Sequence, residues 1–345
     1  MSKTKRIFFV ADTKGLTDRL LLVGLRKQVK GFIRLGHDTQ VFSYNNAITK
    51  ITPIINNSFM KRLCKYKVDD LLVRQIKNYN PDIIIVNFPR YVNAKTVKRL
   101  RDAAPEAALV GLDVDLWPEM HEGRIEVATE LDLVFTTYGS NGQNTLKEKA
   151  VHCFFMPNMC DPDIEHRYDV PDIWKSDILF TGKTRYKNKK YPTEELRYQI
   201  ISRLADMKNC ALYGCFGRNY LGGIQYYYAI SGAKIALSIN ANNNIRLYHS
   251  DRLSQYMACG TFVLAKTVPD SNLLFKDGEH LKYFETIEEF FDLSQWYLEH
   301  KQERVKIAQA GMEWIYQEFN CEKICQYMLD AIENKTYNAP WMNNT

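Results

Sequence analysis

The stretch HSDRLSQYMACGTFVLA at residues 249–265 decides the fold of the second half of the chain. Its polar start, Ser250 and Asp251, is typical of a helix N-terminus, and the small residues 258–260 are typical of a helix end. The apolar run 262–265 then predicts a buried strand, so the whole stretch indicates an α/β domain.

Arg252 occupies the first turn of this predicted helix. Its guanidinium group and the hydroxyl of Ser250 would lie beside the positive end of the helix dipole, where anionic oxygens bind well. The arrangement favours a phosphate group as ligand, and an ordinary surface cation is the alternative interpretation.

Length and composition predict a two-domain cytoplasmic protein. The chain has 345 residues, of which 46% are hydrophobic and 25% charged, which is enough apolar material for two cores. No run is long enough to cross a bilayer, and the start of the sequence lacks a signal-peptide pattern. The eight cysteines never form a C-x-x-C pair, so we expect neither zinc nor disulfides. The net charge of +6 permits an anionic ligand, an anionic membrane surface or nucleic acid.

Apolar runs alternate with amphipathic stretches through residues 1–160. Strands are expected at residues 5–11, 39–44, 82–87, 107–112, 132–137 and 151–156, and helices at 17–35, 58–79, 94–103, 118–129 and 141–149. This alternation predicts a parallel sheet with helices on both faces, which is a Rossmann-like domain.

Turn-forming residues between 157 and 171 indicate a linker, after which a second alternation fills residues 172–322. Strands are expected at residues 177–181, 210–213, 234–239, 262–265 and 281–284. We therefore predict a second Rossmann-like domain, with a helix and tail at 323–345. Two such domains in series would face each other across a cleft lined by the carboxyl ends of both sheets.

Two carboxylates follow the predicted strand at 107–112. Alternate residues of an extended chain point the same way, so Asp113 and Asp115 could share a face, which would raise one pKa and suit one group to base catalysis. The structural alternative is that Asp115 caps the next helix and that Asp113 is an ordinary loop residue.

Two strand-to-helix turns are candidate ligand loops. In the first domain, Asp12, Lys14 and Gly15 form a turn that lacks the G-x-G-x-x-G spacing, which argues against an NAD enzyme and leaves a plain turn or a loop lining the cleft and the acceptor.

In the second domain, Gly182, Lys183 and Arg185 occupy the equivalent turn, where a diphosphate would meet backbone donors and cations. The same run, with Tyr186 and Tyr191, could instead be a solvated loop or contact a nucleic-acid backbone.

Three further polar residues are candidates for contact with a nucleoside or sugar. Asn240 begins an asparagine-rich loop that could read a base or ribose, and His249 could orient or protonate a leaving phosphate; a structural role is the alternative for both. In the turn 277–280, the carboxylates and the histidine are too close together to surround a metal ion, so we expect Glu279 to contact ligand and no metal to bind.

Residues 177–327 resemble the C-terminal domain of GT-B glycosyltransferases, particularly the spore-maturation CgeB-like group within the group 1 enzymes. The resemblance is carried by SDRLSQYMACG at 250–260, VLA at 263–265, LFKDGEH at 274–280 and IAQAG at 307–311.

The resemblance implies that a nucleotide diphosphate sugar binds mainly to the C-terminal domain and the acceptor to the N-terminal one, with a last helix returning to the first domain. Arg252 becomes a diphosphate contact, and the position of Gln255 becomes a ribose or sugar contact. Many retaining relatives carry glutamates where this chain has Leu247 and Gln255, which weakens a retaining assignment.

A second resemblance is to the phage DNA β-glucosyltransferase, an inverting GT-B enzyme. It rests on DVDLWP at 113–118 for the base-bearing turn, FTGKTR at 180–185 for the phosphate loop, and Arg252 with residues 257–258 for the nucleotide helix.

We therefore expect a metal-independent, inverting GT-B glycosyltransferase that uses no cofactor beyond a co-substrate, a UDP-sugar, and transfers to a hydroxyl of a glycan or other surface component. Arg252, Ser250 and the loop 182–185 would hold the diphosphate, and Asp113 or Asp115 would be the base. A DNA acceptor with hydroxymethylated bases, a nucleotide-sugar epimerase, a non-catalytic two-lobed binding protein and peripheral membrane contact stay open as alternatives.

Overall fold

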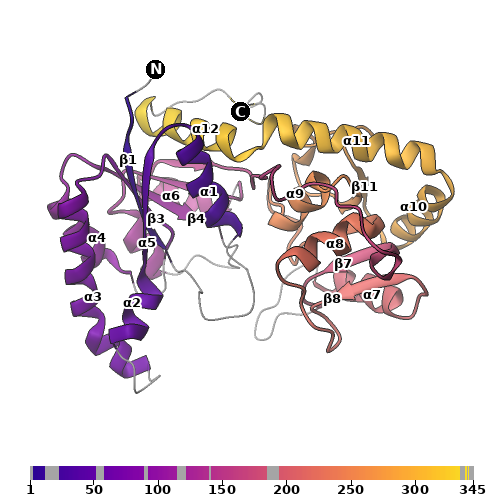
Figure 1. Cartoon of the computed structure of the whole chain (residues 1–345), viewed down its shortest axis with the longest axis horizontal. Helices are drawn as coiled ribbons and strands as arrows, with labels where there is room; N and C mark the ends of the chain where they lie inside the picture. Colours follow the sequence, from indigo (N-terminus) through magenta and orange to yellow (C-terminus); the bar gives the residue numbers. More distant parts are fainter. Residues whose placement is uncertain are drawn as a thin grey trace. The chain divides into compact units, whose positions relative to one another are not determined.

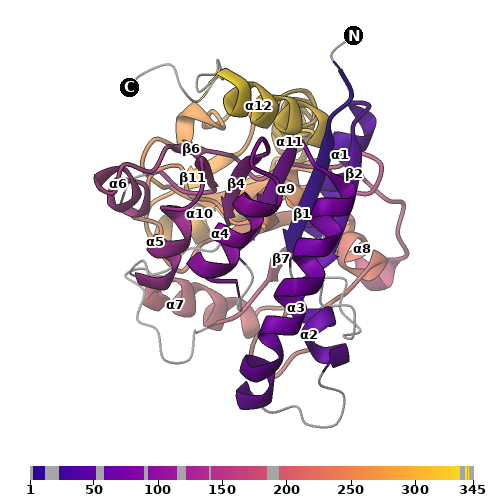
Figure 2. The same cartoon turned by 90° about the vertical axis from the view of Figure 1, so that its left-hand side faces the viewer.

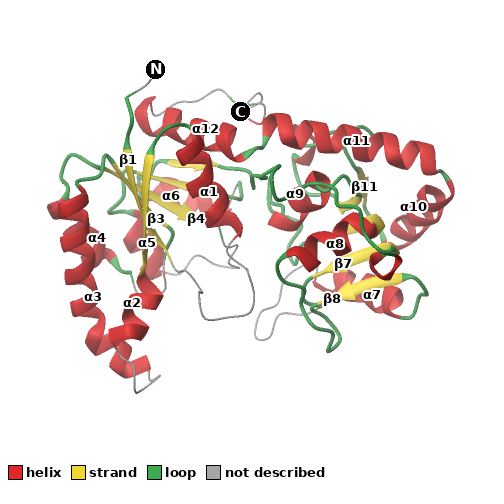
Figure 3. Cartoon of the chain, viewed as in Figure 1, coloured by secondary structure: helices red, strands yellow, loops and turns green. Residues whose placement is uncertain are grey.

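The chain forms two compact units, each built on its own parallel sheet (Figures 1 and 3). The computed structural model describes residues 3–11, 23–51, 58–88, 92–114, 122–139, 141–184, 194–334, 339 and 341. Unit 1 comprises Met1–Thr17, Gln28–Met156 and Cys325–Tyr337, and unit 2 comprises Asp18–Lys27, Pro157–Ile324 and Asn338–Thr345. The segment 157–171 thus groups with unit 2, and the described residues after 324 divide between the units.

Unit 1 contains a six-stranded sheet in the order β2-β1-β3-β4-β5-β6, and every pairing is parallel. Its strands are β1 (Arg6–Ala11), β2 (Asp38–Ser43), β3 (Ile83–Val86), β4 (Ala108–Asp113), β5 (Leu133–Thr136) and β6 (Cys153–Phe155). Both faces of the central strands are buried: Phe8 and Phe9 point to opposite faces of β1, and neither is exposed.

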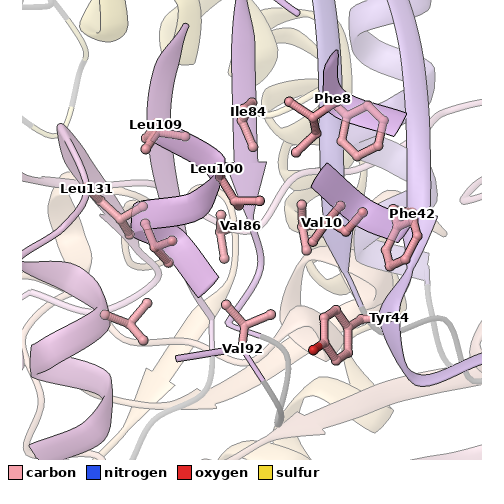
Figure 4. Packing of buried hydrophobic residues seen from close by; sticks show 14 of the residues in the cluster. Phe8, Val10, Phe42, Tyr44, Ile84, Val86, Val92, Leu100, Leu109 and Leu131 are labelled. Atoms are coloured by element: carbon pink, nitrogen blue, oxygen red, sulfur yellow. The ribbon is translucent and has the colours of Figure 1, made fainter. Parts of the chain in front are cut away.

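Helices cover this sheet as expected for continuous apolar strands. They are α1 (Val23–Arg34), α2 (Tyr44–Ile51), α3 (Ser58–Tyr79), α4 (Ala94–Ala103), α5 (Glu122–Ala128), α6 (Asn141–Glu148) and α12 (Cys321–Asn334). Residues of α2, α3, α4 and α5 form one core with Phe8, Val10, Ile84, Val86 and Leu109 of the sheet (Figures 2 and 4).

Unit 2 contains a five-stranded parallel sheet in the order β11-β10-β9-β7-β8. Its strands are β7 (Ser176–Thr181), β8 (Cys210–Tyr213), β9 (Ala233–Ser238), β10 (Phe262–Lys266) and β11 (Lys282–Phe284). Its helices are α7 (Glu194–Ala205), α8 (Ile224–Gly232), α9 (Asp251–Ala258), α10 (Ile287–Glu299) and α11 (Lys301–Glu318), with short 3-10 turns at Asp172–Trp174 and Ser271–Leu273.

The prediction of two Rossmann-like parallel sheets is confirmed, and one local expectation was incomplete. A strand was expected at residues 39–44, but the strand ends at Ser43 and Tyr44 begins helix α2, which was not predicted. The aromatic ring of Tyr44 is buried, and its hydroxyl donates a hydrogen bond of 2.5 Å to Asp69 in α3. Tertiary packing therefore overrides the strand preference of tyrosine at this position.

Candidate functional site

The order of strands in unit 2 identifies the point where a ligand is expected. The chain leaves β7 for β8 at one side of the sheet and returns to β9 on the other side of β7, so β7 and β9 are neighbours with diverging connections. In open α/β sheets, ligands bind outside the carboxyl ends of the strands at such a switch point. Thr181 ends β7, and Ile239 directly follows β9.

The side chain of Arg252 spans this switch point. From the first turn of α9, its two terminal nitrogens donate to the carbonyl oxygens of Thr181 and Ile239, the latter at 3.1 Å. Its Nε donates to the hydroxyl of Ser250, the N-cap residue of α9, at 3.1 Å. Among the residues that the structure describes, Arg252 forms no ion pair, so its charge faces only neutral oxygens.

A second arginine, which no sequence pattern indicated, lies at the same turn. Arg197 in α7 is buried and donates to the carbonyl oxygen of Lys183. The guanidinium groups of Arg197 and Arg252 lie 5.2 and 5.3 Å from the centre of the Phe180 ring. Two cations over one ring concentrate positive charge beside the turn after β7.

Gly182 makes this approach of the two arginines possible. Its φ of +140° is rarely adopted by residues with a side chain. A Cβ atom at this position would lie 2.2 Å from Nη1 of Arg252 and 3.2 Å from Nη2 of Arg197. The two guanidinium groups can therefore lie against the backbone of the turn only because residue 182 has no side chain.

Asn240 and His249 form hydrogen bonds with backbone atoms of the loop that precedes α9. The Asn240 side chain donates to the carbonyl oxygen of Tyr248 and accepts from the backbone N–H of Ser250, both at 3.2 Å. His249 is buried, and its Nδ1 donates to the carbonyl oxygen of Leu247 at 3.3 Å. Burial lowers the pKa of His249 to about 4, so its ring is neutral at physiological pH.

Gln255, predicted to contact ribose or sugar, has both ends of its amide engaged within unit 2. Its Nε2 donates to Asp251 and its Oε1 accepts from the hydroxyl of Tyr226, each at 2.8 Å. The hydroxyl of Tyr256 accepts from the backbone N–H of Thr181 at 3.1 Å. Burial raises the pKa of both tyrosines, which keeps their hydroxyls protonated.

Glu279 does not lie with these residues. It precedes β11 and so belongs to the amino ends of the strands, whereas Gly182 and Ser250 follow the carboxyl ends of β7 and β9. Its carboxylate is 55% exposed and contacts Lys276 and His280 at 3.4 and 3.3 Å.

Two pockets in unit 2 lie at opposite edges of the sheet. A pocket of about 940 Å³ lies at the amino ends of β7, β9 and β10, where Ser176, Ala233 and Phe262 line it, and is therefore remote from Arg252. A pocket of about 570 Å³ is lined by Asn243, Thr267 and other residues that follow the carboxyl ends of β9, β10 and β11. Arg252 and Gly182 lie at the carboxyl ends of the strands, so we expect the ligand at that edge of the sheet.

In unit 1, Asp113 ends β4 and is almost completely buried. Its Oδ1 forms an ion pair with Arg124 of α5, and its Oδ2 accepts a hydrogen bond of 2.7 Å from the hydroxyl of Tyr138. Burial, followed by the nearby carboxylate, raises the pKa of Tyr138. Neither Arg124 nor Tyr138 was predicted from the sequence.

Five predicted site residues lie outside the described part of the chain: Asp12, Lys14, Gly15, Asp115 and Arg185. Within the described part, no three His, Cys, Asp or Glu side chains are grouped so as to hold a metal ion. Across those same residues, every helix is too short or too polar to span a membrane.

Residues 193–330 match the family described as "Glycosyl transferase-like". No curated protein matches the chain by sequence.

Similar solved structures share the fold at low sequence identity. The Anabaena protein HepE in complex with UDP-glucose is 14% identical, with a TM-score of 0.61, over 95% of this chain and 99% of that one. An α-glucosyltransferase in complex with UDP and a 13-mer DNA containing an HMU base is 12% identical, with a TM-score of 0.61, over 96% and 100%. Sucrose-phosphate synthase from Thermosynechococcus elongatus is 12% identical, with a TM-score of 0.60, over 96% and 99%. The chain therefore has the GT-B fold, with two Rossmann-like parallel sheets, and its residues 193–330 match a glycosyl transferase-like family.

Proposed function

We propose that the protein is a glycosyltransferase that moves a sugar from a nucleotide diphosphate sugar to an acceptor hydroxyl. The observation that carries the proposal is Arg252, whose guanidinium group spans the carboxyl ends of β7 and β9 and has no carboxylate partner among the described residues. Arg197 and the side-chain-free backbone of Gly182 lie beside it. Relatives of the same fold that bind UDP or UDP-glucose support a uridine nucleotide as donor.

Breaking the bond between sugar and diphosphate leaves negative charge on the departing phosphate. Two fixed guanidinium groups and the N-terminus of α9 would stabilise that charge without reorganising. We therefore propose that no metal ion is needed, because the arginines supply the positive charge at the leaving group.

Asp113 is the proposed base in an inverting displacement, with the undescribed Asp115 as the substitute. The contacts of Asp113 with Arg124 and Tyr138 hold its carboxylate in one orientation and engage both of its oxygens. Asp113 can accept the acceptor proton only if the approaching hydroxyl weakens one of these two contacts.

The proposed acceptor is a hydroxyl of a glycan or other surface component, as the CgeB-like resemblance of residues 250–260 favours. A modified DNA base is the second candidate, supported by the similar fold of an enzyme bound to HMU-containing DNA. A cytoplasmic location is also part of the proposal. The eight cysteines, which form no disulfide among the described residues, support it.

A thermal-shift screen against nucleotide diphosphate sugars tests the proposal. At ~100-fold saturation, the correct donor should stabilise the protein by roughly 2.7 kcal/mol. Product analysis with and without added acceptor then separates transfer from epimerisation. No stabilisation by any donor would contradict the proposed function.

A further inference from the structure

Lys27 is a buried cation in unit 2, whose segment Asp18–Lys27 includes the start of α1. Its side chain is 1% exposed. Its ammonium nitrogen lies 3.1 Å from Glu165, which is not exposed at all, and 2.9 Å from the carboxylate of Asp251. Burial alone would lower the pKa of Lys27, but the two carboxylates raise it above its ordinary value, so the ammonium group stays charged.

Asp251 connects this cation to the switch point. One of its carboxylate oxygens contacts Lys27, and the other accepts the hydrogen bond from Gln255. Gln255 in turn accepts from Tyr226, whose hydroxyl lies 3.4 Å from that of Thr181 at the end of β7. Polar contacts therefore run without a break from Lys27 to the strand end at which Arg252 donates.

Stability alone does not account for this cluster. Placing three charged groups in or near the interior carries a large desolvation penalty, and well-packed apolar residues commonly serve stability as well or better. The cluster instead fixes the first residue of α9, next to Arg252.

We infer that Lys27 is a positioning residue of the donor site: it holds the Asp251 carboxylate, and through Asp251 and Gln255 it sets the geometry of the carboxyl end of β7. This inference rests on the proposed function, because its effect is on binding of the donor diphosphate. Lys27 does not itself touch the nucleotide and acts only through Asp251.

The test is calorimetric titration with whichever of UDP, GDP, ADP and CDP binds the wild-type protein most tightly. The double variant Lys27→Met/Glu165→Gln removes the cation without leaving Glu165 as an unpaired buried carboxylate. The glutamine side chain introduced at position 165 can still accept the hydrogen bond from the backbone N–H of Asp161. The matched control is Lys234→Met/Asp177→Asn, a lysine–aspartate pair at 2.6 Å at the amino ends of β9 and β7.

We expect the Lys27 double variant to bind the nucleotide about 10-fold more weakly, and the control to bind within about twofold of wild type. Adding Asp251→Asn to the double variant should weaken binding less than about threefold further, because the two positions act through one contact. Asp251→Asn alone changes a partly exposed side chain and so gives the same reading, an approximately 10-fold loss, if the double variant does not fold.

Wild-type affinity in both Lys27→Met/Glu165→Gln and Asp251→Asn would overturn this inference and leave the proposed function intact. The inference would also be contradicted if the loss of affinity in the triple variant equalled the loss in the double variant multiplied by the loss in Asp251→Asn. Such independent effects would mean that Lys27 does not act through Asp251. If none of the four nucleotides binds the wild-type protein, the proposed function fails, and the inference fails with it.

Discussion

The carboxyl ends of β7 in unit 2 and β4 in unit 1 both carry charged residues, but they pair them differently. At β7, Arg252 donates to two carbonyl oxygens and a hydroxyl, so its positive charge is not cancelled by a carboxylate among the described residues. At β4, the carboxylate of Asp113 is already held by Arg124 and Tyr138. Unit 2 therefore offers charge to an anion, whereas the charge in unit 1 is balanced before any ligand arrives.

The largest expected effect comes from closing the turn in unit 2. Gly182→Ala places a Cβ atom 2.2 Å from Nη1 of Arg252 and forces a side chain onto a φ of +140°, so we expect about a 100-fold loss of nucleoside diphosphate affinity in calorimetric titration. Gly278→Ala is the control, because its φ is +71° but nothing lies within 4 Å. Unchanged affinity in Gly182→Ala would mean that the turn is not part of the site.

Asp113→Asn should separate catalysis, assigned to unit 1, from nucleotide binding, assigned to unit 2. We expect turnover to fall by about 100-fold, since the base is removed, while nucleotide affinity stays at the wild-type value. Asp132→Asn provides the control, because Asp132 also pairs with an arginine of unit 1, at 2.7 Å, but precedes β5 instead of following β4. Full turnover in Asp113→Asn, measured by sugar transfer, would remove Asp113 from the mechanism.

Arg197→Lys tests whether unit 2 needs its second guanidinium group. A lysine keeps the charge but loses the planar group that lies over Phe180, so affinity for the nucleotide should fall about 30-fold. Arg203→Lys in the same helix removes a similar ring contact, 3.8 Å from the centre of Phe291, and should leave affinity unchanged. Equal affinities in the two variants would restrict the site to Arg252.

The smallest expected effect is a change in the pH dependence of stability that comes from His249, whose buried ring is neutral. Unfolded His249 gains a proton near pH 6.5, whereas the folded protein resists it down to about pH 4, so acid favours unfolding. Between pH 6 and pH 5, the free energy of unfolding should fall by about 1.2 kcal/mol more in wild type than in His249→Gln. Parallel denaturation curves of the two proteins across this range would show that His249 is not buried.

The fold was largely predictable because apolar strands and amphipathic helices alternate at regular spacing. The stretch 249–265 correctly predicted a short helix followed by a buried strand. Helix α2 was missed because Tyr44 is buried through a partner 25 residues away, which no local pattern reveals.

The site was predictable only where residues adjoin a strand end. Gly182 directly follows β7, and Arg252 lies in the first turn of helix α9; both were predicted to contact the diphosphate, and these roles stay predictions. Arg197 looked like an ordinary helix residue, and the contacts of Lys27 join positions 138 and 224 residues apart. Glu279 precedes β11 and so lies at the amino edge of the parallel sheet, away from Gly182, and its contact with a ligand stays a prediction.

The central claim is that Arg252 forms the diphosphate site of unit 2. Calorimetric titration of UDP into wild type, Arg252→Ala and Arg246→Ala tests it directly, since Arg246 is a nearby arginine already paired with Asp270 at 2.5 Å. We predict that UDP binds wild type and Arg246→Ala with affinities within about twofold, and binds Arg252→Ala at least about 100-fold more weakly. Equal binding of UDP by wild type and Arg252→Ala would contradict the account.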